Sequence, residues 1–511
     1  MSFSLLLLLL FLPSSLSLAP YNFYINCGGS SVINFEGHLW VPDSDFISVG
    51  ENKTVSYSGV LPLLLSVRSF AQERNTHKKF CYQIGPVIRN ANYLVRTTYF
   101  YGGVNGKKNP PVFDQIVDNN LWGLVNTTKE YDHNMTSYYE GVFRTVGKTM
   151  SVCIGVNELT DSDPFISAIE LVLLESSVYN STDFGKVGLS LVARNNFGYT
   201  RSTVRSPDDR FDRFWEPFGP HQAAARAPNV SVSGFWNLPP AKIFETHLTV
   251  SAGPMDLQWP ALPLPSSTYY IALYFADDRA SSRRAFDISI NNVPYVRNLS
   301  VTPSGVAVFA TQWPLDGLTR LRFTPVDGSD ASPLINGGEI FNVLPLGNKT
   351  LVHDVIMLET IKRSFLNPPE DWSGDPCFPI GYSWTGITCS NGTRIRIISI
   401  NLMHMGLQGS LAPEVGNLTA LNTLMLGNNS LSGPIPSRLG TLNHLKILSL
   451  ENNRFSGTIP SSLARIRSLR ELHVENNNLN GTVPKSLLQK PGLQFSFTPG
   501  NSFSQSAGPN T

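Results

Sequence analysis

The densest group of carboxylates in the sequence falls between residues 205 and 216, and its residue types suit acid–base chemistry. Its acidic members are Asp208, Asp209, Asp212 and Glu216. Two such side chains can supply the acid and the base, or the nucleophile, of a glycoside hydrolase. Three arginines, Arg205, Arg210 and Arg213, interleave with them, which equally indicates an ion-paired or solvated segment. The arginines favour a structural role, so a carbohydrate-active enzyme is the least favoured function.

Other catalytic motifs are incomplete. Gly147-Lys148-Thr149 resembles the end of a phosphate-binding loop, but Val142 stands where that motif requires its first glycine. The signature set of protein kinases is absent from the sequence. The nine histidines are scattered without the spacing of zinc ligands. The sequence therefore predicts a protein that is not an enzyme, with no catalytic residue, no metal site and no cofactor.

Aromatic side chains offer a different chemistry, the binding of carbohydrate. Aromatic rings stack on the C–H face of a sugar while planar polar groups bind its hydroxyls. The candidate residues lie near glycine- and asparagine-rich segments and are Tyr99, Tyr101, Trp122, Tyr131, Tyr138 and Tyr139. Each of them alone is better explained as a residue of a β-sheet core or surface. As a set, they predict a ligand-binding region.

The composition limits the classes of function. The formal net charge of +1 at pH 7 lacks the basic excess of a protein that binds nucleic acid, so nucleic acid is not an expected partner. A chain of 511 residues corresponds to about three domains. Its hydrophobic content of 41% is sufficient for ordinary cores.

The first residues predict export. The apolar run from Leu5 to Leu12, followed by Ser17-Leu18-Ala19, is typical of a signal peptide, here spanning 1–19. Eleven Asn-x-Ser/Thr sequons follow, at Asn52, Asn126, Asn134, Asn180, Asn229, Asn298, Asn348, Asn391, Asn417, Asn428 and Asn480. Behind a signal peptide they indicate a glycosylated extracellular surface. No later run has the roughly 18 to 20 apolar residues of a membrane span, so we expect the mature chain to be released.

Five cysteines would meet an oxidising compartment. Cys377 and Cys389 bracket a short loop, and a disulfide between them would stabilise by about 3 kcal/mol in the chain-entropy model. Cys27, Cys81 and Cys153 remain, so at most one further bridge can form among them, and its pairing is open.

Residues 397–490 repeat one pattern four times with a period of 24 residues. The recurring leucines, asparagines and prolines are Leu421, Leu445 and Leu469, then Asn429, Asn453 and Asn477, then Pro436, Pro460 and Pro484. Apolar residues at fixed offsets in such short units predict stacked leucine-rich repeats. Prolines in each copy exclude one long amphipathic helix.

The variable strand positions of these repeats predict one concave face for a partner protein. Its residues are Asn401, Met403, Met425, Ser449, Glu451, His473 and Glu475. Four repeats offer a small surface, which suits a co-receptor contact better than a standalone high-affinity receptor.

Before the repeats, short β-branched and aromatic runs between turn residues predict β-sandwiches. Landmarks of the first stretch recur in the second: Tyr93–Phe100 matches Tyr269–Phe275, and Pro164–Glu170 matches Pro333–Glu339. A duplicated module explains this order. We therefore predict a mainly β protein with modules at 20–177 and 183–346. A linker helix with a segment that resembles a repeat cap, described below, at 348–393, repeats at 394–493 and a polar tail at 494–511 follow.

Several phrases resemble those of known families. Ile25-Asn26-Cys27-Gly28-Gly29, Lys79-Phe80-Cys81-Tyr82 and the segment Arg205–Trp215 resemble the malectin-like domains of plant receptor kinases. Asp371–Cys377 and Trp384–Cys389 resemble the N-terminal disulfide cap of plant leucine-rich repeats, and Leu-x-Gly-x-Ile-Pro resembles their extracellular class. The resemblance implies two tandem malectin-like β-sandwiches followed by a short leucine-rich repeat solenoid.

That resemblance also implies a receptor-like recognition protein, secreted or at the extracellular face of the plasma membrane. Its modules are expected to bind cell-wall glycan or a peptide or protein ligand. Its repeats are expected to bind a receptor kinase or another membrane protein as co-receptor. An inhibitor acting through the repeats, or a structural cell-wall protein, is the alternative function.

Overall fold

The computed structural model describes residues 21–57, 59–71, 77–105, 110–128, 131, 135–219, 230, 232–277 and 283–504. The predicted signal peptide lies outside these residues. In the first half, one sheet contains β1 (Phe23–Asn26), β2 (Ile33–Phe35), β3 (His38–Pro42), β7 (Asn92–Tyr99), β10 (Ser137–Arg144) and β13 (Ala168–Leu173). A second contains β6 (Lys79–Ile84), β8 (Val112–Val117), β9 (Asn120–Asn126) and β11 (Met150–Gly155). A third contains β4 (Glu51–Thr54), β5 (Ser66–Ser69) and β12 (Phe165–Ile166), and the short helices η1 (Asp43–Asp45) and η2 (Pro62–Leu64) lie in the loops.

Strand alternation explains how these sheets share a core. Tyr93 and Val95 of β7 point to one side and pack with Tyr82 of β6 in one buried cluster. Leu94, between them in sequence, belongs to a different cluster on the opposite face. Successive side chains of a strand point to opposite faces, so β7 is buried on both sides.

The second half repeats this plan. Its first sheet contains β14 (Val187–Phe197), β15 (Glu216–Phe218), β18 (Leu264–Phe275), β21 (Val306–Gly317) and β24 (Gly337–Pro345). The facing sheet contains β17 (Met255–Gln258), β19 (Arg284–Ile290), β20 (Val293–Val301) and β22 (Arg320–Pro325). A small pair of strands, β16 (Leu248–Thr249) and β23 (Leu334–Ile335), and two short helices, η3 (Val232–Gly234) and η4 (Ala241–Glu245), complete it. Leu273, Phe286 and Phe323 join the two sheets in one core.

The two halves are joined through the backbone. β14 pairs with β10 in antiparallel register, Gly141 opposite Ser190 and Val142 opposite Leu189. The main sheets consequently form one eleven-stranded sheet in the order β2-β3-β1-β13-β7-β10-β14-β24-β18-β21, with β15 beside β14. A Cβ on Gly141 would lie 2.8 Å from the carbonyl oxygen of Leu189, so glycine permits this close approach. The sequence predicted two modules but not this shared sheet.

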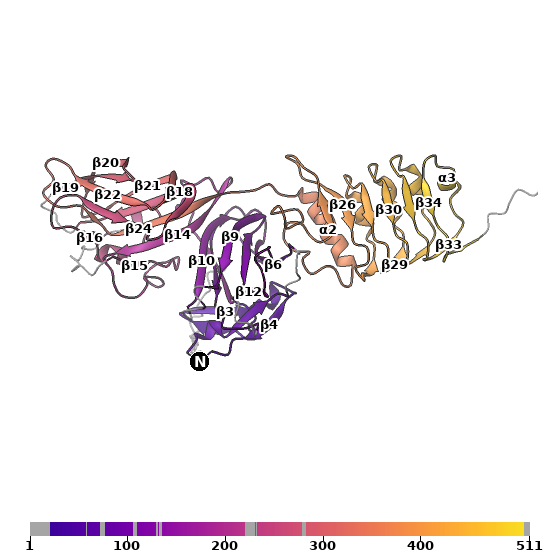
Figure 1. Cartoon of the computed structure of the whole chain (residues 1–511), viewed down its shortest axis with the longest axis horizontal. Coiled ribbons are helices and arrows are strands. Elements are labelled where there is room, and N and C mark those ends of the chain that lie inside the picture. Colours follow the sequence, from indigo (N-terminus) through magenta and orange to yellow (C-terminus); the bar gives the residue numbers. More distant parts are fainter. Residues whose placement is uncertain are drawn as a thin grey trace, which may run out of the picture.

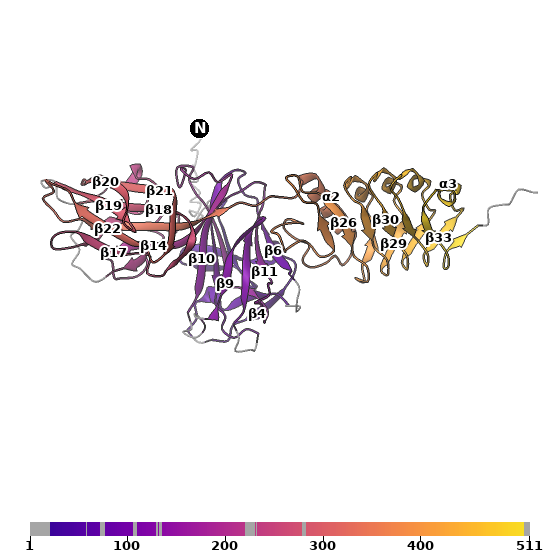
Figure 2. The same ribbon diagram turned by 45° about the horizontal axis from the view of Figure 1, so that its top comes forward.

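The repeats follow helix α2 (Val352–Ser364). One parallel sheet contains β26 (Ile397–Asn401), β28 (Thr423–Met425), β30 (Ile447–Ser449), β32 (Glu471–His473) and β34 (Gln494–Ser496), with β25 (Ile387–Cys389) antiparallel at its start. A second parallel sheet contains β27 (Gln408–Ser410), β29 (Ser430–Pro434), β31 (Arg454–Gly457), β33 (Asn478–Gly481) and β35 (Ser502–Phe503). Along the chain, a short helix connects each of the first four strands of the second sheet to the next strand of the first; these helices are η5 (Pro413–Asn417), η6 (Ser437–Thr441), η7 (Ser461–Arg465) and α3 (Lys485–Leu488). In Figures 1 and 2 the first half lies between the second half and the repeats.

The asparagines of the repeats bind backbone groups of their own and neighbouring repeats. The side-chain amide of Asn453 donates to the carbonyls of Leu426, Leu450 and Glu451, and its oxygen accepts from the amide of Leu431. Asn501 makes the same kind of bonds at the end of the stack. The first part of the predicted polar tail therefore contributes strands β34 and β35. Asn501 lies 24 residues after Asn477, which is the signal that would have extended the repeats.

Replacing Asn453 by alanine should destabilise the repeats by about 1–3 kcal/mol, because a buried amide and several carbonyls lose their partner. Hydrogen–deuterium exchange mass spectrometry of the full chain over residues 426–434 should show faster exchange. Asn478→Ala, at an exposed position of β33, is the matched control. Unchanged exchange in Asn453→Ala would contradict this role of the asparagine.

Candidate functional site

The structure places the carboxylates of residues 205–216 among arginines and other donors. Asp209 is buried and accepts bonds from Arg213 Nε (2.9 Å) and Trp215 Nε1 (2.8 Å). Asp212 is also buried and binds both Nε and Nη2 of Arg205, at 3.0 and 2.7 Å. Glu216 accepts from the hydroxyls of Thr203 and Tyr138, at 2.8 and 3.2 Å, and Asp208 is exposed.

The segment that carries these carboxylates contacts a row of alternating charges through Asp212 and Arg213. This row crosses five neighbouring strands. The row runs Glu170 on β13, Arg96 on β7, Glu140 on β10, Arg194 on β14 and Glu339 on β24. We call it the charge ladder. Its consecutive ion pairs, Glu170–Arg96, Arg96–Glu140, Glu140–Arg194 and Arg194–Glu339, each measure 2.7 Å, and all five residues are buried. Arg96 also donates to the backbone carbonyl of Asp212 at 2.5 Å.

The ladder shifts the pKa values of its carboxyl groups in opposite directions. Burial tends to raise the pKa of Glu140, but Arg194 and Arg96 outweigh it and hold the pKa below its usual value. Asp212 likewise keeps a lowered pKa, because hydrogen bonds from Arg205 and the charge of Arg96 outweigh burial. Burial raises the pKa of Glu170 to about 7, since Arg96 only partly compensates and Asp212 adds repulsion.

The geometry gives these carboxylates a structural role. A glycosidase needs one carboxyl group free to protonate a leaving group and a second free to attack or to activate water. Arginine or backbone and side-chain donors occupy the oxygens of Asp209, Asp212 and Glu216. Sequence reasoning missed the ladder itself. The signal was a single charged residue inside each β-run, and Glu170 and Glu339 end the two matched landmarks.

The predicted aromatic residues divide into two groups. Tyr99, Tyr101 and Trp122 are buried, and the Trp122 indole donates to Ser190 across the two halves at 3.0 Å. Tyr131, Tyr138 and Tyr139 are half-buried. Tyr131 packs edge-on against Tyr101 at 4.8 Å, and Tyr139 packs against Tyr99 at 5.9 Å. Ligand binding by this set stays a prediction, and the half-buried members have the accessible surface.

The predicted repeat face has a defined register. Asn401, Met425, Ser449 and His473 are direct neighbours on parallel strands β26, β28, β30 and β32. Ser449 is buried and donates to Glu451 at 2.7 Å, whereas Met403, Met425, Glu451, His473 and Glu475 are half-buried and Asn401 is exposed. His473 lies between Glu471 and Glu475, at 3.8 and 4.0 Å. The face therefore combines methionines with an acidic end.

The cysteines form two bridges. Cys377–Cys389 links the cap as predicted, and Cys81–Cys153 settles the open pairing. Cys27 is free and buried. Cys81 and Cys153 face each other on β6 and β11, and together with Ile116 they pack against Tyr382 of the cap.

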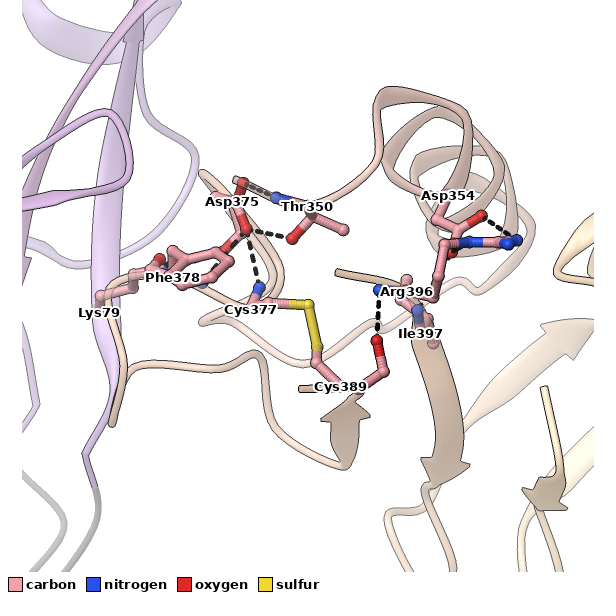
Figure 3. Close-up of a disulfide and its surroundings, with 10 residues drawn as sticks. Lys79, Thr350, Asp354, Asp375, Cys377, Phe378, Cys389, Arg396 and Ile397 are labelled. Atoms are coloured by element: carbon pink, nitrogen blue, oxygen red, sulfur yellow. Dashed lines mark hydrogen bonds and ion pairs between the residues drawn. A yellow bond between two sulfur atoms is a disulfide. The ribbon is translucent and has the colours of Figure 1, made fainter. Parts of the chain in front are cut away.

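The cap also binds the first half through polar contacts. Lys79 Nζ donates to the carbonyl oxygens of Asp375, at 2.5 Å, and Phe378, as Figure 3 shows. Burial lowers the pKa of Lys79 to about 8, against the attraction of Asp375 and Asp371. The hydroxyl of Tyr382 donates to Asp114 at 2.6 Å. Sequence reasoning missed this junction, although Lys79 belongs to one of the phrases that carried the family resemblance.

Nine of the sequons lie within the described residues. Asn52, Asn126, Asn180, Asn298, Asn348, Asn391 and Asn480 are exposed, and Asn417 and Asn428 are half-buried. Asn134 and Asn229 lie outside the described residues. The accessible positions are compatible with glycan attachment, which stays a prediction.

Family comparisons agree with these parts of the fold. The malectin-like domain model matches residues 25–343. The leucine rich repeat N-terminal domain matches 353–390, and leucine rich repeats match 420–442, 444–466 and 468–489. The malectin-like match covers more than half of the chain, so the protein belongs to the malectin-like domain family, with leucine-rich repeats after that domain.

The similar curated proteins are plant receptor kinases. The chain is 30% identical over 435 residues to the probable LRR receptor-like serine/threonine-protein kinase At1g67720 of Arabidopsis thaliana, covering 79% of this chain and 45% of that protein. It is 30% identical over 358 residues to the receptor-like protein kinase At3g21340 of the same plant, covering 67% and 39%. The chain thus spans 39–45% of the length of these relatives.

Solved structures share the fold of 63% of the chain. The ANX2 ectodomain of Arabidopsis thaliana has a TM-score of 0.53 and 15% identity, covering 63% of this chain and 96% of that one. A structure of the plant peptide RALF23 in complex with FER and LLG2 has a TM-score of 0.51 and 16% identity, covering 63% and 95%. At this identity the likeness concerns the fold alone.

No helix among the described residues is long and apolar enough to cross a membrane. Within the same residues, no three His, Cys, Asp or Glu side chains are grouped to hold a metal ion.

Replacing Glu140 by glutamine should lower the free energy of unfolding by about 3–5 kcal/mol, because it leaves two buried arginines with too little negative charge. Guanidinium denaturation followed by tryptophan fluorescence measures the loss. Glu158→Gln, at an exposed position, should change stability little. Equal stability of the two variants would show that the ladder does not hold the sheet together.

The opposite pKa shifts predict two pH-dependent limbs of stability. The lowered pKa values of Glu140 and Asp212 give stability that is present above their unfolded pKa, near 4, and is lost as pH falls through the folded values. The raised pKa of Glu170 gives stability that is present below about 4.5 and is lost as pH rises through about 7. Glu170→Gln should remove only the second limb in denaturation midpoints measured from pH 3 to 9. A wild-type and a Glu170→Gln curve of the same shape would contradict the assignment.

Proposed function

We propose that this chain is the recognition part of a receptor-like protein that acts outside the cell. The observation that supports this most is the order of its parts, a malectin-like domain followed by a capped set of leucine-rich repeats. The alignment with an LRR receptor-like kinase extends over 79% of this chain. The malectin-like part would bind the ligand, and the repeats would bind a co-receptor. The predicted signal peptide and the accessible sequons support an extracellular location.

In this proposal the malectin-like part acts as two tandem β-sandwich modules and the repeats act as a short solenoid. Each half of the long sheet shares a buried core with its own facing sheet, which supports the first statement. One buried cluster runs from helix α2 and the cap tryptophans to Leu487, which supports the second.

Between the two ligand classes, a peptide or protein is favoured over a cell-wall glycan. The aromatic residues that would stack on sugars are half or fully buried, which leaves little ring surface for a pyranose. The structurally similar FER chain, by contrast, was solved with the peptide RALF23 and with LLG2. Carbohydrate binding is the second candidate.

The repeat face would recruit the partner. Met403 and Met425 are adaptable apolar side chains of a kind common at protein-binding surfaces. Glu451 and Glu475 add negative charge beside them and would favour a basic patch on the partner.

The full chain should be tested, because Lys79 and Tyr382 connect the malectin-like part to the cap and a cut between them would expose both surfaces. We expect Met425→Arg combined with Glu475→Arg to weaken binding to a plant receptor-kinase ectodomain at least tenfold in a protein-array screen with biosensor follow-up. Asn478→Gln, at an exposed position on the other repeat sheet and outside any sequon, is the control.

The same full chain on a wall-glycan array separates the ligand classes. If the chain binds a glycan and this binding is lost in Tyr131→Ala or Tyr139→Ala, the ligand is a carbohydrate and the peptide hypothesis is wrong. Absence of any ectodomain partner, together with inhibition of a wall-degrading hydrolase, would contradict the receptor-like function.

A further inference from the structure

A cleft of about 480 Å³ lies where the first half of the malectin-like part meets the linker and helix α2. We call it the junction cleft. The lining residues on which the argument rests are Asp118, Val146, Lys349, Val352, Ile356 and Glu359. Thr350 and Asp375 line the cap side of the same cleft and are drawn in Figure 3. Its walls come from two parts of the molecule, and ligand sites occur preferentially at such junctions.

The walls of the junction cleft carry aliphatic side chains that the fold does not bury. Val146 is 53% exposed, Val352 59% and Ile356 54%. Val352 and Ile356 are four residues apart in α2 and therefore share a helix face. The opposite face of α2 is used differently, since Leu358 and Ile361 are buried in the repeat core. Large aliphatic residues gathered on one exposed surface mark an interaction site.

The polar end of the junction cleft is a carboxylate without a cation. Asp118 Oδ1 accepts one bond, from the amide of Ser151 at 2.8 Å. Within the described residues, no lysine, arginine or histidine lies within ion-pair distance of it. Three buried aspartates elsewhere do have such a partner, in the pairs Asp43–Arg68, Asp277–Arg284 and Asp354–Arg396. The carboxylate of Asp118 can therefore pair with a cation, but the described residues supply no cationic side chain for it.

The charged residues that line the junction cleft do not supply a cationic partner for Asp118. Lys362 lines the cleft, but its Nζ donates to the carbonyl of Trp372. Asp375 is engaged by Thr350 and by the amides of Cys377 and Phe378. Glu359 is half-buried in α2, and it adds a second negative charge to the cleft. The exposed Lys349 remains at the rim as a positive charge.

We propose that the junction cleft binds a peptide segment in which an arginine or lysine stands next to aliphatic residues. The cationic side chain pairs with Asp118, and the aliphatic side chains cover Val146, Val352 and Ile356. Charge-assisted bonds of this kind are stronger than neutral ones. The inference deepens the proposed function and rests on its peptide-binding part, because it assigns the peptide to a particular site.

The pKa of Asp118 adds a pH signature to this site. Burial, and then the nearby Asp375, raise it to about 6, against the Ser151 amide bond. Only the ionised carboxylate pairs with a cation, so affinity should rise as pH increases from 5 to 7. Asp375, Glu359, Lys349 and Lys362 are the other titratable groups that face the cleft, and Asp118→Asn leaves all four in place.

The test uses the glycosylated full chain and a random heptapeptide display library. The sequence enriched on wild type is then synthesised twice, once with its basic residue and once with neutral citrulline or glutamine in that place. Isothermal titration calorimetry at pH 5 and 7 measures both peptides against wild type, Asp118→Asn, Ile356→Ser and the exposed control Asp316→Asn.

Enrichment of a basic residue flanked by aliphatic ones is the expected result. Asp118→Asn should weaken the basic peptide at least tenfold, leave the neutral peptide unchanged and abolish the pH dependence. Ile356→Ser should weaken the binding of both peptides, and Asp316→Asn should change the binding of neither. Enriched peptides that bind all four proteins equally would overturn the junction cleft while leaving peptide recognition intact. A library that yields no binding sequence would overturn both.

Discussion

The buried charge ladder is the interaction on which the arrangement of the malectin-like part depends. Two ion-paired ends, Glu170–Arg96 and Arg194–Glu339, belong to different halves, and Glu140 connects them. Removing five charged groups from water is costly, and such networks are weak sources of net stability. Their value lies in the arrangement that they permit, because any shift of β14 along β10 would leave buried charges unpaired. The ladder thus fixes the register that two backbone pairs alone would hold weakly.

The two junctions of the molecule differ in kind. The first junction is a continuous sheet. The segment from Arg205 to Trp215 covers one face of this sheet and forms ion pairs with the ladder through Asp212 and Arg213. The second joins the cap to β6, β8 and β11 through Lys79, Asp114 and Tyr382 and the Cys81–Cys153 bridge beneath them. The covalent bridge holds β6 to β11, so the surface that receives Tyr382 keeps its shape. The repeats are therefore positioned by side-chain contacts, whereas the two halves share a continuous sheet whose register the charge ladder fixes.

Periodicity and landmarks predicted most of the architecture, because they depend on local spacing. The 24-residue period predicted the repeat strands and the positions of their asparagines, and the matched landmarks predicted a duplicated module. The sequence did not predict the shared sheet or the Cys81–Cys153 pairing, since each joins residues that are far apart in the sequence. The candidate site shows the same division. The column from Asn401 to His473 follows from the period. The aromatic residues could not be sorted into core and surface, because Tyr99, Tyr138 and Tyr139 lie on β7 and β10, where side chains on both faces are buried or half-buried and alternation gives no guide.

The carboxylate groups show why residue type alone does not define a site. Asp209 and Asp212, which looked catalytic in the sequence, are neutralised by arginines that the fold brings to them. Asp118, which no motif marked, has a backbone amide for one oxygen and open space beside it. A buried carboxylate with a partner has completed its electrostatic role within the fold. The half-buried Asp118 has no such partner among the described residues and lies beside aliphatic side chains that the fold leaves exposed, which is why we propose recognition at the junction rather than in the charged centre of the sheet.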